Sequence, residues 1–134
     1  MFNLAISSKL RGCDLVNLHA RDVMHGNQIL PRAMVVQRKT RYPELTEPTR
    51  SAVSAWIEMA SLGPEHYLFP SRLAKSPHIS TRHYARIVHR WVAAIGLDSA
   101  VYGTHTMRRT KATLIYKRTK NLRAVQLVLG HTKL

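Results

Sequence analysis

Residues 80–96, STRHYARIVHRWVAAIG, carry the clearest helical signal in the chain. Ser80 is a favoured N-cap residue, and Gly96 is of the type that most often ends a helix. The apolar side chains between them follow a 3-1-3-1-3 spacing, which is typical of an amphipathic helix with one buried face. These apolar residues are Tyr84, Ile87, Val88, Trp91, Val92 and Ile95. The other face repeats an arginine at every fourth position, Arg82, Arg86 and Arg90, with no carboxylate placed to pair with this stripe.

Further helices are predicted on both sides of this one. A short helix is expected over residues 14–18, and a longer one runs from the cap residue Thr46 to Gly63-Pro64. A third helix begins near residue 104 or 105, and a fourth runs from about residue 121 to Gly130. In the third helix the residues expected to point inward are Met107, Leu114 and Ile115.

Two short segments have strand character. Residues 33–37, AMVVQ, are apolar and β-branched, and residues 44–46 form a second extended piece. The intervening residues 40–43, TRYP, suit a hairpin loop. The sequence therefore predicts one domain over residues 1–134 that is mainly α-helical with a small antiparallel β-sheet (α+β).

The charge is large and unevenly distributed. The chain has 21 Lys and Arg against 7 Asp and Glu, a formal net charge of +14. Residues 66–134 hold thirteen of the basic residues and one acid, Asp98. Solvated helices normally mix the two signs, because Glu–Lys pairs stabilise them. A half chain of one sign indicates a polyanionic partner, and we expect double-stranded DNA, whose counterions are released on binding.

Simple counts exclude several classes of protein. The single cysteine, Cys13, cannot form an internal disulfide, so a disulfide-stapled secreted scaffold is excluded. No apolar run is long enough to span a membrane, and the first residues lack the basic start of a signal peptide. A cytoplasmic protein with no membrane partner is expected. The phosphate loop GxxxxGK[ST] is absent, so neither ATP chemistry nor a small-molecule substrate is predicted.

Metal chemistry is not predicted either. The chain has eight histidines, but His78, His83 and His89 are five and six residues apart, whereas a helical ligand pair needs a spacing of four. We interpret these three as exposed histidines on the basic helix. The few acids disfavour a carboxylate-rich two-metal nuclease and a Ser-His-Asp triad. No cofactor is therefore expected.

The side chains left for chemistry are cationic groups and imidazoles: Arg11, Lys39, His105, Arg108 and His131. Guanidinium groups bind phosphate oxygens through forked donors and keep their proton. Imidazoles donate to phosphate or move protons near neutral pH. His105 and Arg108 are three residues apart, so on a helix they point to the same side. The set suits a metal-free site that acts on a phosphodiester.

Four segments resemble motifs of the tyrosine recombinases, the phage integrase family. SSKLRGCDLVNL (7–18) resembles the first arginine motif of this family, and VVQRKTRYPELTEPTR (35–50) resembles its β-hairpin lysine motif with the helix that follows. THTMRRTKAT (104–113) resembles the HxxR box, and VQLVLGHTKL (125–134) resembles the LGH box. The order and spacing of the motifs agree, which implies the catalytic-domain fold of the family over almost the whole chain.

The resemblance also implies a role for each candidate residue. Arg11 and Arg108 would clamp the scissile phosphate and stabilise its transition state. Lys39 would protonate the leaving 5′ oxygen, His105 would act as general base or phosphate donor, and His131 would be a second donor. The family cuts and rejoins DNA through a 3′-phosphotyrosyl intermediate, without metal or ATP.

Two departures from the family pattern accompany this match. The nucleophilic tyrosine of the family lies roughly two to three helical turns beyond the LGH histidine, and this sequence ends at Leu134, three residues after His131. None of its five tyrosines sits in the nucleophile motif. The N-terminal DNA-clamping domain of the family has no counterpart either. We expect a catalytic-domain fragment that is inactive and monomeric alone, from a family that assembles as multimers on DNA.

The expected partner is duplex DNA, with backbone contacts from Arg82, Arg86, Arg90 and Arg109. The resemblance implies a bacterial or phage origin, a DNA-associated location, and a role in DNA integration or recombination in a mobile element. Two alternatives stay open. One is a non-enzymatic DNA-binding module on the same fold, and the other is an RNA- or DNA-binding adaptor with no phosphodiester pocket. A tyrosine-bearing helix beyond Leu134 would distinguish the enzyme from both.

Overall fold

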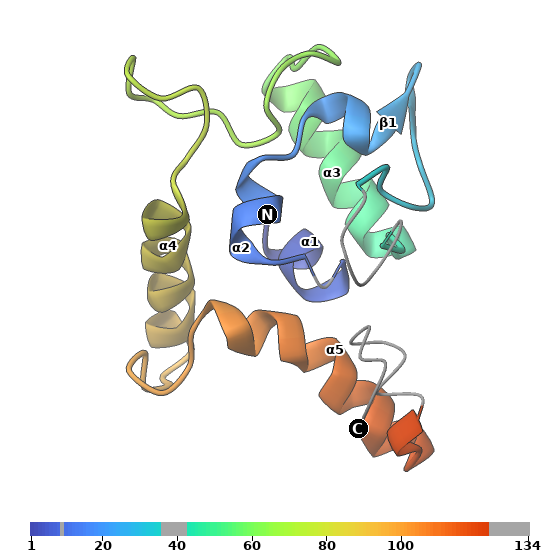
Figure 1. The fold of residues 1–134 in the computed structure, drawn as a ribbon, viewed down its shortest axis with the longest axis vertical. Helices are drawn as coiled ribbons and strands as arrows, with labels where there is room; N and C mark the ends of the chain where they lie inside the picture. The colour runs from blue at the N-terminus through green and yellow to red at the C-terminus, as the bar shows by residue number, and fades with distance from the viewer. Residues whose placement is uncertain (9, 36–42, 124–134) are drawn as a thin grey trace.

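The computed structural model of the protein describes residues 1–8, 10–35 and 43–123, apart from the side chains of Arg108 and Lys111. Its elements are α1 (Phe2–Ser7), α2 (Gly12–Val16), the 3-10 helix η1 (Ala20–Asp22), β1 (Met24–His25), β2 (Gln28–Ile29), α3 (Glu47–Met59), α4 (Thr81–Ala94) and α5 (Thr104–Thr119). In Figure 1, α1, α2, α3 and the sheet lie together, α4 runs along one side of them, and α5 lies across one end. This is the predicted fold class, mainly α with a small antiparallel sheet.

The core forms where α1 and α2 meet the longer helices. α1 packs against α3 and α5, and α2 packs against α4. Helices as short as these two are not stable in isolation, so burial in the core must fix their positions. The side chains at the centre are almost fully buried: Leu4, Leu15, Val16, Leu18, Val23, Leu68 and Val88.

Helix α4 matches its prediction closely. The Ser80 hydroxyl accepts a hydrogen bond from the backbone N–H of His83 at 3.0 Å, as an N-cap should. Gly96 follows the helix with a φ of +79°, the left-handed conformation that ends helices at low cost for glycine. The buried side chains are Tyr84, Val88 and Val92. Ile95 differs from the prediction, because at the last turn its side chain is 73% exposed.

The β-sheet forms earlier in the chain than predicted. β1 and β2 pair antiparallel, with Met24 opposite Ile29 and His25 opposite Gln28. Gly26, at a φ of +60°, supplies the left-handed turn conformation that a two-residue hairpin loop requires. The Gly-Asn dipeptide was the available sequence signal for this turn.

The strand predicted at residues 33–37 is wrong in its described part, because residues 33–35 belong to no strand. The chain instead pairs briefly just before that point. Ala33 donates its N–H to the Pro43 carbonyl at 2.9 Å, and Leu45 donates to the Pro31 carbonyl at 2.8 Å. Pro31 and Pro43 have no N–H to donate, so this pairing cannot grow into a regular ladder. Residues 36–42, which include most of the predicted hairpin loop, lie outside the described residues.

Helix α3 begins after Thr46, as predicted, but ends at Met59 rather than at Gly63. Ser61 ends it by adopting a left-handed φ of +52°. Thr46 occupies the N-cap position, yet its hydroxyl lies 2.9 Å from the hydroxyl of Thr49 and caps no backbone N–H. The predicted start of this helix is therefore confirmed, but the Thr46 hydroxyl does not form the N-cap hydrogen bond on which the prediction was based.

Helix α5 starts at Thr104, as predicted, but buries less than expected. Of its described side chains only Met107 and Ala112 are buried, and Leu114, predicted to point inward, is 52% exposed. The helix ends at Lys120, which has a left-handed φ of +54°. The helix predicted over residues 121–130 lies outside the described residues beyond position 123. Within the described residues, no helix is long and apolar enough to cross a lipid bilayer.

Candidate active site

Three helices begin around one small cavity. It has a volume of about 290 Å³ and is formed by the first residues of α2, α4 and α5. Arg11 and His105, which are far apart in the sequence, both line it. The complete lining is Leu10, Arg11, Gly12, Cys13, Thr81, Tyr84, Ala85, Thr104 and His105. None of these residues is acidic, so the cavity presents positive charge with no carboxylate against it.

The helix starts add to this positive character. The first four backbone N–H groups of a helix lack partners within the helix, and the aligned peptide dipoles place a partial positive charge there. α4 and α5 are 14 and 16 residues long and both direct this end toward the cavity. Together with a guanidinium and an imidazole, the arrangement is suited to an anion such as a phosphate.

The position of Arg11 follows from the residues around it. Leu10 is 4% exposed and Leu15 is fully buried, so the segment is anchored in the core on both sides of the arginine. Arg11 itself is exposed and occupies the N-cap position of α2 with extended backbone angles. Its side chain is therefore presented at the surface from a firmly held backbone.

Gly12 allows α2 and α4 to approach each other closely. A β-carbon at this position would lie 3.2 Å from Cδ1 of Tyr84, tighter than ordinary side-chain contacts. Tyr84 is 3% exposed, and this burial raises the pKa of its phenol to about 12. The Tyr84 phenol, although it lines the cavity, is therefore harder to ionise than an ordinary tyrosine.

His105 is held by the first turn of α5. The Thr106 hydroxyl accepts a hydrogen bond from the Gly103 N–H at 3.2 Å, and the side chain of Met107 is buried. These two contacts fix the start of the helix while His105 is exposed at the cavity. Arg108 lies in the same helix, but its side chain is outside the part of the molecule that the structure describes. Lys39 and His131 lie outside the described residues, so two of the five candidates are seen together.

The arginine stripe of α4 is exposed, and within the described residues Arg82, Arg86 and Arg90 form no ion pair. Arg86 and Arg90 line a cavity that shares no residue with the Arg11–His105 cavity, and Arg82 is among the lining residues of neither. Arg109 is exposed on α5, four residues after His105 and so on the same side of that helix.

The three histidines interpreted as exposed on the basic helix are only partly so. His78 precedes α4 and is half-buried, with its ring centroid 4.7 Å from that of Tyr67. His83 is half-buried, and His89 is exposed as predicted. In the part of the chain that the structure describes, no three His, Cys, Asp or Glu side chains gather in a way that could hold a metal ion.

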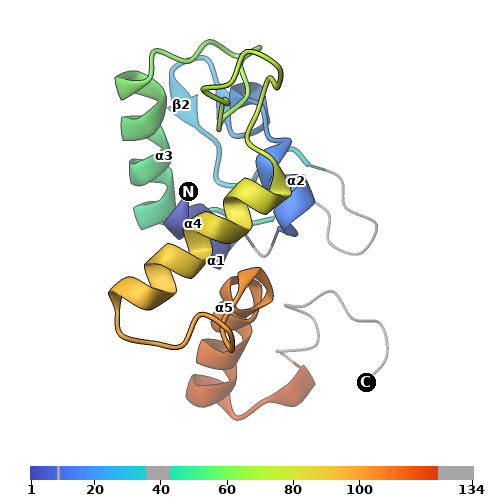
Figure 2. The same cartoon turned by 90° about the vertical axis from the view of Figure 1, so that its left-hand side faces the viewer.

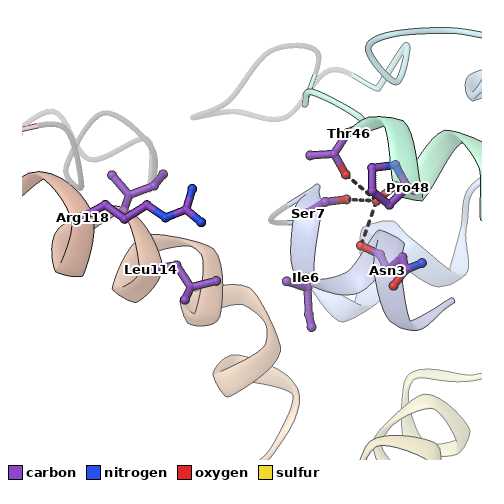
Figure 3. A pocket seen from close by; sticks show the side chains of 9 residues that line it. Asn3, Ile6, Ser7, Thr46, Pro48, Leu114 and Arg118 are labelled. Atoms are coloured by element: carbon purple, nitrogen blue, oxygen red, sulfur yellow. Dashed lines mark hydrogen bonds between the residues drawn. The ribbon is translucent and has the colours of Figure 1, made fainter.

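Another cavity, of about 370 Å³, lies between the start of α3, α1 and α5. Figure 3 shows Leu114 and Arg118 on its α5 side, facing Ile6 and Ser7. Thr49 binds the Ser7 hydroxyl at 2.8 Å and donates to the Asn3 carbonyl at 3.4 Å, so its polar atoms join α1 to α3. These hydroxyl and carbonyl groups therefore form hydrogen bonds with one another. Leu114 and Ile115 line the cavity, which explains why they are less buried than predicted.

Sequence reasoning missed the contribution of α4 to the Arg11–His105 cavity. Tyr84 was correctly predicted as part of the buried stripe, and the Ser80 cap correctly located the start of the helix. No sequence pattern near residue 80 indicated that the N-terminal end of α4 would lie beside Arg11. The available signal was Gly12, since a glycine directly after the motif arginine is what a close helix approach requires.

Comparison with known proteins gives a consistent result. The sequence model described as "Phage integrase family" matches residues 1–134. The chain is 31% identical over 134 residues to a tyrosine recombinase of Pseudothermotoga lettingae, covering 100% of this chain and 45% of that protein. It is 29% identical over 132 residues to the probable integrase/recombinase YoeC of Bacillus subtilis, covering 98% of this chain and 70% of that one.

Solved structures agree at the level of the fold. The crystal structure of XerA recombinase matches with a TM-score of 0.77 at 22% identity, over 98% of this chain and 46% of that one. The XerH site-specific recombinase, solved bound to its difH substrate as a pre-cleavage complex, matches with a TM-score of 0.72 at 23% identity. That match covers 98% of this chain and 39% of the XerH chain. The chain thus spans about half the length of most of these proteins, or less.

Proposed function

The chain belongs to the phage integrase family, and we propose on this basis that it is the catalytic part of a site-specific DNA recombinase. In this proposal it binds duplex DNA and activates one phosphodiester for attack by a tyrosine. The observation that carries the proposal is the meeting of Arg11 and His105 in a cavity formed by three helix starts and free of acids.

The proposed chemistry follows from the charges at this cavity. As a tyrosine oxygen bonds to phosphorus, the bond to the 5′ oxygen breaks and negative charge builds on the non-bridging oxygens. Arg11 and the helix starts would stabilise that charge, since preorganised donors act most strongly on charge that develops in the transition state. Arg108 would complete the clamp, and His105 would act as general base or phosphate donor. Lys39 would give a proton to the leaving oxygen, and His131 would donate to the phosphate.

The tyrosine itself would come from a segment other than residues 1–134. Tyr84 is the one tyrosine among the residues that line the cavity. Its phenol is buried, and this burial raises its pKa to about 12, so it is harder to ionise than an ordinary tyrosine. We propose that the 134 residues form a single domain that grips and polarises the phosphate.

DNA binding tests the first half of this proposal. Affinity for a short duplex should fall steeply with salt, because each phosphate contact releases about one counterion. Arg82→Ala and Arg109→Ala should each lower the slope of log affinity against log salt by about 1. Arg21→Ala is the matched control, since Arg21 is an exposed arginine already paired with Glu65. Affinity that does not depend on salt would contradict the proposal.

Covalent capture tests the second half. The 134-residue chain should give no DNA–protein adduct on a denaturing gel, and the chain extended by a tyrosine-bearing helix should trap a nicked suicide substrate. In the extended chain Arg11→Ala should lower the capture rate roughly 100- to 1000-fold, the effect of removing one transition-state donor, with little change in DNA affinity. Salt-dependent binding without capture by the extended chain would instead support a non-enzymatic DNA-binding module.

A further inference from the structure

A cavity of about 680 Å³ lies on the side of α4 that carries Arg86 and Arg90. It is more than twice the volume of the Arg11–His105 cavity, at about 290 Å³. Its floor and rim come from α3, from residues 69–73 and from α4. In Figure 2, α4 lies in front, with α3 to its left. We call this cavity the tryptophan groove, because both tryptophans of the chain, Trp56 and Trp91, line it.

The floor of the tryptophan groove is apolar and held in place. Phe69 and Ile79 are buried beneath it, at 6% and 9% exposure. The indole N–H of Trp56 donates to the Leu68 carbonyl at 2.7 Å, so the polar atom of that ring is satisfied inside the protein. The ring of Trp91 meets that of Phe2 edge-on, with centroids 5.3 Å apart and planes at 87°. The groove therefore offers fixed carbon surface rather than free polar groups.

The rim of the groove is cationic. Arg72, Arg86 and Arg90 are exposed, and His83 stands beside them. None of the residues that line the groove is acidic, and within the described residues none of the three arginines forms an ion pair. The groove therefore has an apolar floor and a positively charged rim. This combination favours an occupant that is apolar in the middle and negatively charged at its edges.

Duplex DNA does not match this combination. Its phosphates could reach Arg86 and Arg90 but would leave the apolar floor unfilled. A large apolar side chain that enters such a cavity is instead the usual anchor of a protein segment bound in a groove.

We propose that the tryptophan groove is a docking site for an acidic amphipathic protein segment, with a large apolar side chain on the floor and carboxylates beside Arg72, Arg86 and Arg90. The arginine stripe is then divided between two partners. Arg82, which lines neither cavity, is left for DNA, and Arg86 and Arg90 serve a protein. This function is independent of the proposed recombination chemistry, because the two cavities share no lining residue.

Intrinsic fluorescence provides a direct test, because both tryptophans line the groove. The probe is a synthetic 16-residue helical peptide without tryptophan that carries Leu and Phe on one face and Glu on the other. Titration into the 134-residue chain should give a saturable change in tryptophan emission. A peptide with Lys in place of Glu, and one with Ser in place of Leu and Phe, should both bind at least roughly tenfold more weakly.

Charge reversal then maps the site. The double variant Arg86→Glu, Arg90→Glu should bind the acidic peptide roughly tenfold or more weakly. Arg82→Glu, the matched charge reversal in the same stripe, should change the affinity for the peptide less than about twofold. All three side chains are exposed, and circular dichroism confirms that each variant folds. The proposal is overturned if the acidic peptide fails to bind, if Arg82→Glu weakens it equally, or if duplex DNA displaces it competitively. These outcomes are separate from DNA capture, which tests the proposed function.

Discussion

The two long helices that meet at the Arg11–His105 cavity are anchored very differently. α4 has a hydroxyl cap at Ser80, a buried stripe of three side chains and a left-handed glycine at its end. α5 has no side-chain cap on its N-cap residue, Gly103, and it ends at Lys120 in a left-handed conformation that costs a lysine more than a glycine. Of its described side chains, Met107 and Ala112 alone are buried.

This difference indicates how the cavity is held together. One side of it is a helix that its own sequence stabilises along its whole length. The other side is a helix that packs on α1 and whose described buried side chains are Met107 in its first turn and Ala112 further along. The remainder of α5 is cationic, and Leu114 and Tyr116 are substantially exposed. We expect substitutions in α4 to cost stability and equivalent substitutions in the later turns of α5 to cost little.

The sharpest test replaces one tyrosine in each helix. Tyr84→Ala should destabilise the protein by about 3–5 kcal/mol, because it removes a large side chain that is 3% exposed and packed in the core. Tyr116→Ala should cost less than about 1 kcal/mol, because that ring is 40% exposed. Urea unfolding followed by circular dichroism measures both. Equal losses would show that α5 is anchored as firmly as α4.

The phenol of Tyr84 also predicts a pH dependence. Its pKa is raised from 10 to about 12 in the folded protein, so folding favours the protonated form. The corresponding stability is complete below pH 10 and is lost as the pH rises from 10 to 12, by about 2–3 kcal/mol. The free energy of unfolding should fall less over this interval in Tyr84→Phe than in the wild type. Tyr116→Phe is the matched control, and a Tyr84→Phe curve that parallels it would refute the assignment.

The cap of α4 gives a smaller effect. Ser80→Ala removes the acceptor of the His83 N–H and should cost about 1 kcal/mol. Thr113→Ala removes a hydroxyl from the exposed face of α5, where it bonds only to the Arg109 carbonyl, and should be neutral or slightly stabilising. Thermal unfolding of the two variants compares these values directly. A loss in Thr113→Ala as large as that in Ser80→Ala would remove the contrast between the helices.

The last comparison replaces the residues that end the two helices, and its smallest effect is expected at Lys120. Lys120→Gly should stabilise the protein by up to about 1 kcal/mol, since glycine takes a left-handed φ without strain. The gain is reduced by loss of the contact between the Lys120 ammonium and the Tyr116 ring, at 5.7 Å. Gly96→Ala, the reverse change at the end of α4, should destabilise by about 1 kcal/mol or more. Two shifts of the same sign in the melting temperature would contradict this account.

How well the sequence predicted each helix depends on where its stabilisation originates. α4 was predicted with its cap, its end and the three residues at the centre of its buried stripe, because these signals are local, whereas Ile95 was wrongly placed in the stripe. α5 was predicted at its start, but Leu114 was placed inward on weak periodicity, and tertiary packing leaves it beside a cavity. The hairpin of β1 and β2 was missed because each strand is only two residues long. The Gly-Asn turn therefore has no run of alternating apolar and polar residues on either side to mark it as a hairpin.

The candidate site was predictable only through the resemblance. No periodicity joins Arg11 to His105, and the packing of α2 on α4 and of α4 on α5 brings them together. The tryptophan groove was not predicted at all. Trp56 and Trp91 fitted the buried stripes of two helices, and the stripe of Arg86 and Arg90 was interpreted as a DNA surface. Which helix faces remain uncovered is a property of the assembled fold, and local patterns do not encode it.

The close approach at Gly12 has a consequence for how this protein can vary. A library randomised at position 12 and selected for an intact Arg11–His105 cavity should favour glycine, because a β-carbon there would lie 3.2 Å from Cδ1 of Tyr84 and push the ring aside by a few tenths of an ångström. The same library at Gly103, where a β-carbon would meet nothing within 4 Å and φ is −136°, should tolerate many residues. Two glycines at the same cavity would thus leave different records in a lineage, one restricted to small residues and one free to vary.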